Sequence, residues 1–169
     1  MVRENLNPLT VELQRLPMVD YVSANIEYKK MGAYYFLPQT DHGAVVGDVE
    51  LATAGANLTL MQLVMMQPDG KYDPSDADAE ATADGILGIV LSSNAGTLAD
   101  TNRFVLVLEG WVRDDTWTWT VGDDLFVSNA PGAMTNAAPV GAGDVVRRVG
   151  HAVSAKVVYF HPDNHYEVL

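Results

Sequence analysis

The sequence of 169 residues contains no cysteine, so disulfides, thiolate metal ligands and thiol nucleophiles are excluded. Basic residues are also few, since 10 Lys and Arg stand against 22 Asp and Glu, which gives a formal net charge of −12. Nucleic acids and anionic membranes are bound through clustered basic side chains, so this charge argues against both as partners. No run of about 18 apolar residues is present, and we therefore expect no membrane-spanning segment.

Apolar residues make up 48% of the sequence, which is enough to form a packed core. The length suits one domain with an appended arm. Residues 1–5 lead into no apolar stretch, so we expect no secretory signal and a protein that is made in a reducing cytoplasm. Without disulfides, packing, alone or together with oligomerisation, has to hold the fold.

Residues 1–25 are predicted to form an N-terminal arm that carries a short helix or an extended segment. Asn7 is suited to cap a helix and Pro8 to occupy its first position. Leucines then recur at spacings of three and four, on one helical face; with Pro8 they are the candidate contact residues, Leu6, Pro8, Leu9, Leu13 and Leu16. Pro17 ends the helix. Such a short helix is marginal in water alone, so it docks either on its own domain or on a neighbouring subunit or assembly.

Residues 26–169 are predicted to form one all-β domain, a barrel or sandwich, because short apolar segments alternate with glycine-rich turns. The expected strands are 33–37, 44–53, 58–66, 85–91, 104–112, 117–121, 125–127, 145–149, 157–160 and 166–169. The segment 58–66 also suits a helix, since it contains Met61, Met65 and Met66. Turn residues and acids dominate 67–84, which we predict to be a long exposed acidic loop.

The search for chemistry predicts no enzyme, no cofactor and no metal site. His151, Ser154 and Asp144 could pair as a triad, but no serine stands in a Gly-x-Ser-x-Gly elbow. His161 and His165 flank a proline turn, which would separate their rings. The acids of 73–84 do not fit an EF-hand, because position 91 has Leu where a Glu ligand is required. The glycine-rich segments lack the lysine and the helix of a phosphate-binding loop.

Three tryptophans are the remaining candidates for a functional surface. Trp117 and Trp119 alternate, so they would share one face of a strand. Together with Trp111 they would form a core, a subunit interface or a platform on which a sugar stacks.

A set of motifs in about residues 122–169 resembles a C-terminal module found in structural proteins of tailed bacteriophages, among them head decoration and fibre-like subunits. The motifs are a strand that ends in Val127-Ser128, a turn at Pro131-Gly132, the strand Gly143-Asp144-Val145-Val146-Arg147, the step Val149-Gly150 and the ending Tyr159-Phe160-His161-Pro162-Asp163.

The resemblance implies a barrel-like virion subunit, often trimeric, with no catalytic residues to transfer. We expect a phage capsid decoration (cement) protein that binds the outer surface of the assembled head and stabilises it. Its partners would be the major capsid protein and other copies of itself in a homotrimer. The alternative is a tail or fibre-like virion subunit that binds a host-surface glycan.

Overall fold

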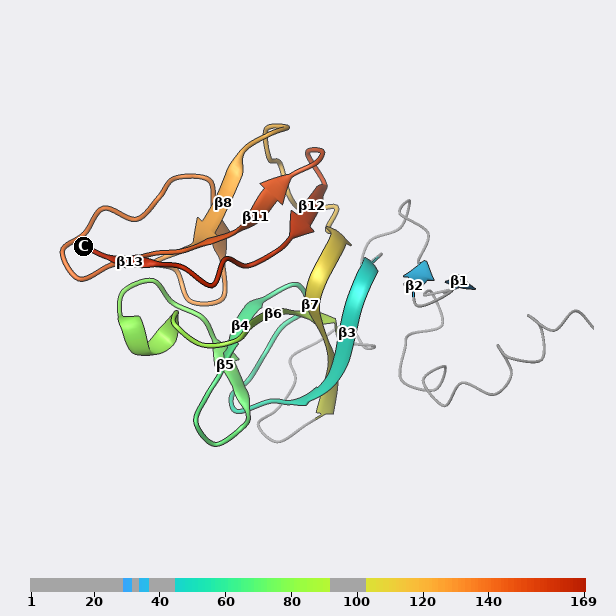
Figure 1. Ribbon diagram of the computed structural model, residues 1–169, viewed down its shortest axis with the longest axis horizontal. Helices are drawn as coiled ribbons and strands as arrows, with labels where there is room; N and C mark the ends of the chain where they lie inside the picture. The colour runs from blue at the N-terminus through green and yellow to red at the C-terminus, as the bar shows by residue number, and fades with distance from the viewer. Residues whose placement is uncertain (1–28, 32–33, 37–44, 92–102) are drawn as a thin grey trace, which may run out of the picture.

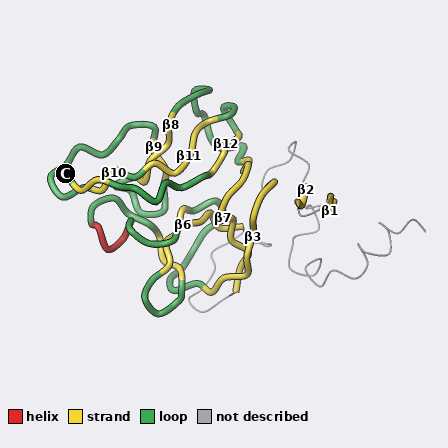
Figure 2. Tube along the Cα trace, viewed as in Figure 1, coloured by secondary structure: helices red, strands yellow, loops and turns green. Residues whose placement is uncertain are grey.

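The computed structural model describes residues 29–31, 34–36, 45–91 and 103–169, and in these ranges the regular structure is almost entirely β (Figure 1). Turns and loops join the strands (Figure 2), and one turn of 3-10 helix, η2, lies at Glu80–Thr82. The predicted all-β class with a barrel-like sheet is therefore confirmed. Over the same ranges, the structure contains no helix with the length and hydropathy to cross a membrane.

The strands in chain order are β1 (Lys29–Met31), β2 (Tyr34–Phe36), β3 (Val45–Thr53), β4 (Leu63–Met66), β5 (Tyr72–Pro74), β6 (Leu87–Leu91), β7 (Arg103–Arg113), β8 (Asp124–Val127), β9 (Met134–Thr135), β10 (Val145–Val146), β11 (Arg148–Ala152), β12 (Val157–Phe160) and β13 (Glu167–Val168). One 11-stranded antiparallel sheet contains all of them except β10 and β13, which pair with each other.

Strand β7 is the centre of the sheet. Along one edge it pairs with β3 over almost its whole length, and its other edge is divided between β6, opposite residues 105–107, and β12, opposite residues 110–113. From β6 the sheet continues through β4 to β5, and from β12 it continues through β11 and β8 to β9. These two branches curl into a half-barrel, beside which β3 and β7 lie next to each other (Figure 1).

Apolar clusters lie on both faces of the central strands. The larger cluster fills the half-barrel and takes residues from both branches, among them Leu63, Met65, Leu87, Ile89, Leu125, Val127, Val149, Val158 and Phe160. A second cluster on the opposite face of the sheet contains Leu58, Val64, Tyr72, Val90, Phe104 and Leu106. Strand β6 is buried at every position for this reason, and a strand buried on both faces has a continuous apolar sequence.

A row of four paired residues crosses the inner face of the sheet, and three of the four are glycines. Gly47 pairs with Gly110, Gly110 with Phe160, and Phe160 with Gly150. Phe160 is fully buried and fills the space beside glycines that have no side chain. A Cβ on Gly150 would overlap the carbonyl oxygen of Tyr159. The φ angle of Gly150 is 150°, which residues with a side chain rarely adopt, so the close pairing of β11 with β12 depends on this residue.

Most predicted strands are present, with shifted ends. The segments 33–37, 44–53, 85–91, 104–112, 125–127, 157–160 and 166–169 correspond to β2, β3, β6, β7, β8, β12 and β13, and 145–149 overlaps both β10 and β11. The strand expected at 58–66 begins only at Leu63. Before it, Met61 adopts a φ of 63° in a turn in which the Gln62 N–H donates to the carbonyl of Thr59.

The prediction of a long exposed loop at 67–84 is wrong. The segment contains β5 and η2, and it buries Tyr72, Ser75, Ala77 and Ala83. The Ala77 N–H donates to the carbonyl of Ser128, and its own carbonyl accepts from the Val145 N–H. Small residues and backbone bonds therefore attach the segment to the C-terminal branch, and such anchors leave little hydrophobic signal in a sequence.

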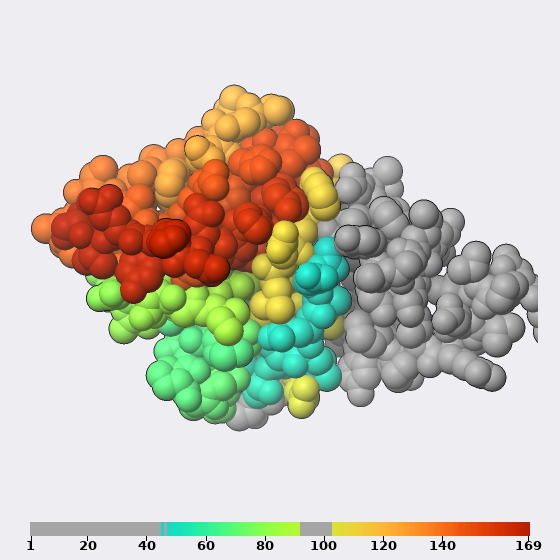
Figure 3. Space-filling view, in the orientation of Figure 1, coloured from blue at the N-terminus to red at the C-terminus, as the bar shows by residue number. Residues whose placement is uncertain are grey.

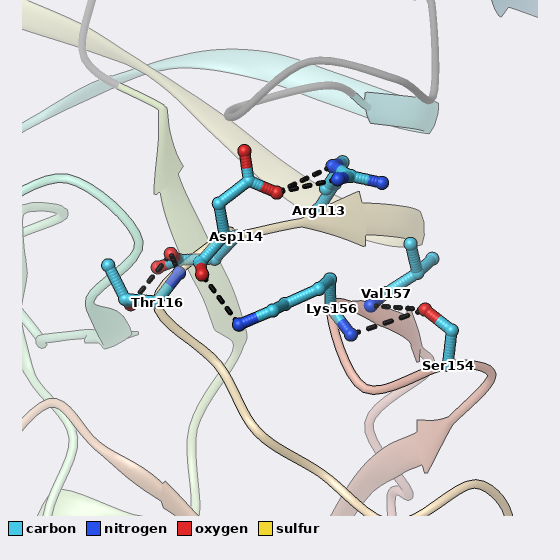
Figure 4. A network of polar contacts seen from close by, with 7 residues as sticks. Arg113, Asp114, Thr116, Ser154, Lys156 and Val157 are labelled. Carbon is cyan, nitrogen blue, oxygen red and sulfur yellow. Dashed lines mark hydrogen bonds and ion pairs between the residues drawn. The ribbon is translucent and has the colours of Figure 1, made fainter.

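The strand predicted at 117–121 is also absent. A turn at residues 115–116 precedes the segment, and the Trp119 N–H donates to the carbonyl of Ala155 between β11 and β12 rather than to a strand. The Asp114 carboxylate accepts hydrogen bonds of 2.7 Å from both the backbone N–H and the hydroxyl of Thr116. The Lys156 ammonium donates to the carbonyl of Asp115 at 2.7 Å, which connects the turn to the β11–β12 hairpin (Figure 4). Side-chain bonds of this kind compete with strand pairing, and strict alternation alone does not reveal them.

We predict that Gly150→Ala destabilises the domain by about 3 kcal/mol, because the new Cβ meets the backbone of β12 and the φ angle is unfavourable. Gly70→Ala is the matched control, since Gly70 has a φ of 80° but open space around it; it should cost only about 1 kcal/mol. Urea unfolding measures both values, and equal losses would show that close approach of the strands is unimportant.

We also predict an alkaline loss of stability that depends on Tyr72. Burial, and then the 2.9 Å hydrogen bond from its hydroxyl to Glu50, raise the pKa of Tyr72. The folded chain therefore keeps this proton above about pH 10, where an unfolded tyrosine loses it, and the free energy of unfolding falls by up to about 1.4 kcal/mol per pH unit. Urea unfolding at pH values from about 8 to about 11 measures this fall in the free energy of unfolding. The fall should be shallower in Tyr72→Phe, and an unchanged slope would contradict the role of Tyr72.

Candidate functional site

The outer face of the sheet carries a row of aromatic side chains on three adjacent strands. Trp111 of β7 pairs with Tyr159 of β12, which pairs with His151 of β11. These positions alternate with the inward row that contains Phe160, so their side chains point outward. Trp111 is 40% exposed, His151 is exposed and Tyr159 is half-buried between them. We call Trp111, Tyr159 and His151 the outer aromatic row.

Tyr159 holds the row together through its ring. Its centroid lies 4.6 Å from that of Trp111, with the planes at 41°, and 5.4 Å from that of His151, edge-on at 61°. His161, two residues further along the chain, stacks nearly parallel to it at 5.8 Å and 10°. Cross-strand aromatic pairs stabilise antiparallel sheets, and here they fix the orientation of every ring in the row.

Glu109 adds a polar group beside the row. Its Oε1 atom accepts a 3.0 Å hydrogen bond from the Tyr159 hydroxyl, and Nδ1 of His161 lies 3.1 Å from the same oxygen. The bond to Glu109 raises the pKa of Tyr159, so the phenol stays neutral and remains a donor. A carboxylate, a phenol and an imidazole are thus held in one arrangement on strands β7 and β12, at the surface.

A groove of about 480 Å³ adjoins this cluster. Its lining includes Glu109 and His161, the exposed Ile86 before β6, and Asp84 and Asn164 from the two neighbouring loops. The space-filling view shows the C-terminal segment packed against the segment before β6, and both supply groove residues beside those of β7 (Figure 3). The groove therefore forms where the two branches of the sheet meet.

Arg147 fixes the two loops that form the groove. It is only 4% exposed, and its guanidinium donates to three carbonyl oxygens, those of Ala83 at 2.6 Å, Gly85 at 2.7 Å and Asp163 at 2.8 Å. Burial lowers the pKa of Arg147, but an arginine keeps its charge at physiological pH. One side chain thus connects the segment before β6 to the segment after β12.

No protein-family model matches the chain, and no curated protein is significantly similar to it. The geometry of the chain itself therefore has to indicate the site.

The three predicted tryptophans lie in two different environments. Trp111 belongs to the outer aromatic row. Trp117 and Trp119 lie 6.3 Å apart, centroid to centroid, are half-buried and pack against the core of the half-barrel. They line a second groove, of about 380 Å³, together with Met61, Gln62 and Met134. The indole N–H of Trp119 is buried, so of the three alternatives that the sequence left open for this pair, packing against the core describes it best.

The other site residues that the sequence suggested either lie outside the described residues or do not come together in one site. The arm residues Leu6, Pro8, Leu9, Leu13 and Leu16 lie outside the described residues. In the β11–β12 hairpin, the Ser154 hydroxyl oxygen accepts hydrogen bonds from the backbone N–H groups of Lys156 and Val157 (Figure 4). The Asp144 carboxylate accepts from the Gly141 N–H, and His151 contacts Tyr159. Among the described residues, no cluster of three or more His, Asp or Glu side chains is arranged to hold a metal ion.

Sequence reasoning missed Glu109 and Tyr159 as site residues, and it considered His161 as a metal ligand. A weak signal was present, because His161 follows the predicted strand 157–160 directly and lies two residues after Tyr159, the spacing at which side chains share a face of a strand. Nothing local indicates that Trp111 and Glu109 join them, since this depends on the pairing of β7 with β12 across nearly 50 residues of sequence.

We predict that Arg147→Met destabilises the domain by about 3–5 kcal/mol, because it removes the donor from three carbonyl groups at the junction of the branches. The neighbouring Arg148 is the matched control. It forms exposed ion pairs with Asp163 at 3.0 Å and Asp124 at 3.2 Å, and Arg148→Met should cost about 1 kcal/mol or less. Denaturant unfolding of both variants tests the contrast; similar losses would mean that Arg147 has no special role.

Proposed function

We propose that this chain is a decoration subunit of a tailed-phage head, which binds as a homotrimer to the outer surface of the assembled capsid and stabilises it. Support comes from the position of the phage-like motifs in the fold. Arg147 of the Gly-Asp-Val-Val-Arg motif connects the two branches, Gly150 of the Val-Gly step allows the close approach of β11 and β12, and Asp163 supplies a carbonyl to Arg147. The residues that resemble the phage module are thus those that hold the body together.

A body of this kind suits a subunit that acts by adhering to a lattice. Its strands are cross-connected without disulfides, and its net charge of −12 opposes nonspecific association with nucleic acid. A ligand that binds only the mature lattice stabilises that lattice by mass action. The major capsid protein would be the partner, and residues 1–25 with their leucines would supply the contact, while the β domain faces outward.

The first experiment is to mix the purified chain with undecorated capsids and to image the pelleted particles by cryo-electron microscopy. We expect regular trimeric density on the outer surface at the local three-fold positions, together with a higher melting temperature of the capsids. Bare capsids, with the protein left in the supernatant, would contradict the decoration role.

A variant without residues 2–20 locates the contact. We expect it to lose capsid binding while its far-UV circular dichroism and thermal unfolding stay those of the β domain. Val140→Ser is the control, because Val140 is 88% exposed and lies in the β domain; its binding should be unchanged. Capsid binding by the truncated protein at full affinity would exclude the arm as the contact.

A further inference from the structure

We propose that the surface formed by Trp111, Tyr159, His151, His161 and Glu109 is a binding site for a neutral oligosaccharide. The site does not depend on the capsid role, because it lies in the β domain and uses none of residues 1–25.

The first argument is the exposure of large aromatic rings at fixed positions. The outer face of an antiparallel sheet can be polar without loss of stability, yet β7 places a 40% exposed tryptophan there, next to Tyr159. Exposed aromatic surface that is rigid, and lies in the middle of a sheet, is available for ligand contact at little entropic cost. The apolar C–H face of a pyranose ring matches the face of such a ring in size and polarity.

The second argument is that hydrogen-bonding groups lie next to the aromatic surface. A sugar presents hydroxyl groups at the edge of its apolar face, and its recognition needs donors and acceptors close to the aromatic platform. Glu109 supplies a carboxylate that the Tyr159 hydroxyl already orients at 3.0 Å. His151 and His161 supply imidazole nitrogens next to the Tyr159 ring. The polar groups are therefore in place before a ligand arrives.

The groove of about 480 Å³ extends the site beyond a single sugar ring. Glu109 and His161 belong both to the cluster and to the groove lining. Further along, Asn164 adds an amide, Asp84 a carboxylate and Ile86 a 53% exposed apolar side chain. A chain of sugar units that stacks on Trp111 and passes Glu109 would continue into this groove, so the ligand class is an oligosaccharide.

The charges of the site select a neutral ligand. Glu109 and Asp84 present carboxylates to the site, whereas the guanidinium of Arg147 in the groove lining is buried and donates to backbone carbonyls. The whole chain carries a net charge of −12. A uronic acid, a sialic acid or a sulfated sugar would meet repulsion at both levels. A second copy of the same face is disfavoured for the same reason, because each copy brings a net charge of −12 and the carboxylates of Glu109 and Asp84 to the contact.

The test measures binding of defined oligosaccharides to the full-length protein by isothermal titration calorimetry. The neutral probes are maltohexaose, cellohexaose and chitohexaose, and hexagalacturonate is the acidic comparison. We expect at least one neutral probe to bind and hexagalacturonate not to bind. Trp111→Ala should weaken that binding by at least about tenfold, as removal of an aromatic anchor does.

Two further variants separate the contributions. Tyr159→Phe keeps the ring but loses the bond to Glu109, so its affinity should fall less than that of Trp111→Ala. Val140→Ala is the control, since it removes an exposed apolar side chain elsewhere on the domain; its affinity should equal that of the original chain. The melting temperature of each variant shows that it is folded.

A measurement on the unmodified protein covers the case in which Trp111→Ala does not fold. In nitrogen-15 NMR spectra, the bound probe should shift the indole N–H of Trp111 and the amides of Tyr159 and His161, but not the indole signals of Trp117 and Trp119. The proposal is overturned if no neutral probe binds at concentrations up to about 10 mM, or if Trp111→Ala binds as the original chain does. A Trp111→Ala variant that only changes the oligomeric state would overturn it in favour of a subunit contact.

Discussion

The buried guanidinium of Arg147 is the interaction on which the arrangement of the domain depends. Burying a charge without bonds for its N–H groups is expensive, and here three backbone carbonyls accept from it. Those carbonyls belong to two segments far apart in sequence, one before β6 and one after β12. The position of the C-terminal branch over the N-terminal branch is therefore set by a polar contact, while the apolar cluster inside supplies most of the burial.

Strand β7 transmits this arrangement to the surface. Its register with β12 places Gly110 opposite Phe160, and one residue further it places Trp111 opposite Tyr159. Successive residues of a strand face opposite sides, so the register that seats Phe160 in the core also builds the outer aromatic row. A slip by one residue would expose Phe160 and bury Trp111 against the half-barrel. Core and candidate site thus share one geometric constraint.

This constraint explains what could and could not be predicted from the sequence. The continuous apolar run in β7 and the turns that bound β3, β8 and β12 are local signals, and they were sufficient for the all-β class and for most strands. The segment 117–121 alternates as a strand does, but it follows a turn that the Asp114 carboxylate holds through Thr116, and its Trp119 N–H donates to the carbonyl of Ala155 instead of to a strand. The segment 67–84 has few large apolar residues, and its attachment depends on backbone bonds to Ser128 and Val145 that no local pattern reveals.

The candidate site was harder to predict than the fold for the same physical reason. The sequence offered Trp111, Trp117 and Trp119 together and could not separate them, because a platform needs neighbouring strands that support it. Trp111 has this support, because Tyr159 lies beside it and is itself held by Glu109, His151 and His161. These partners come from three strands and become neighbours only when the sheet has formed.

The arm proposed to bind the capsid and the face proposed to bind a saccharide use separate residues of the chain. A subunit attached through residues 1–25 would therefore leave the outer aromatic row free, and decoration of a capsid would display many copies of a weak saccharide site, so that avidity strengthens what one site alone binds weakly.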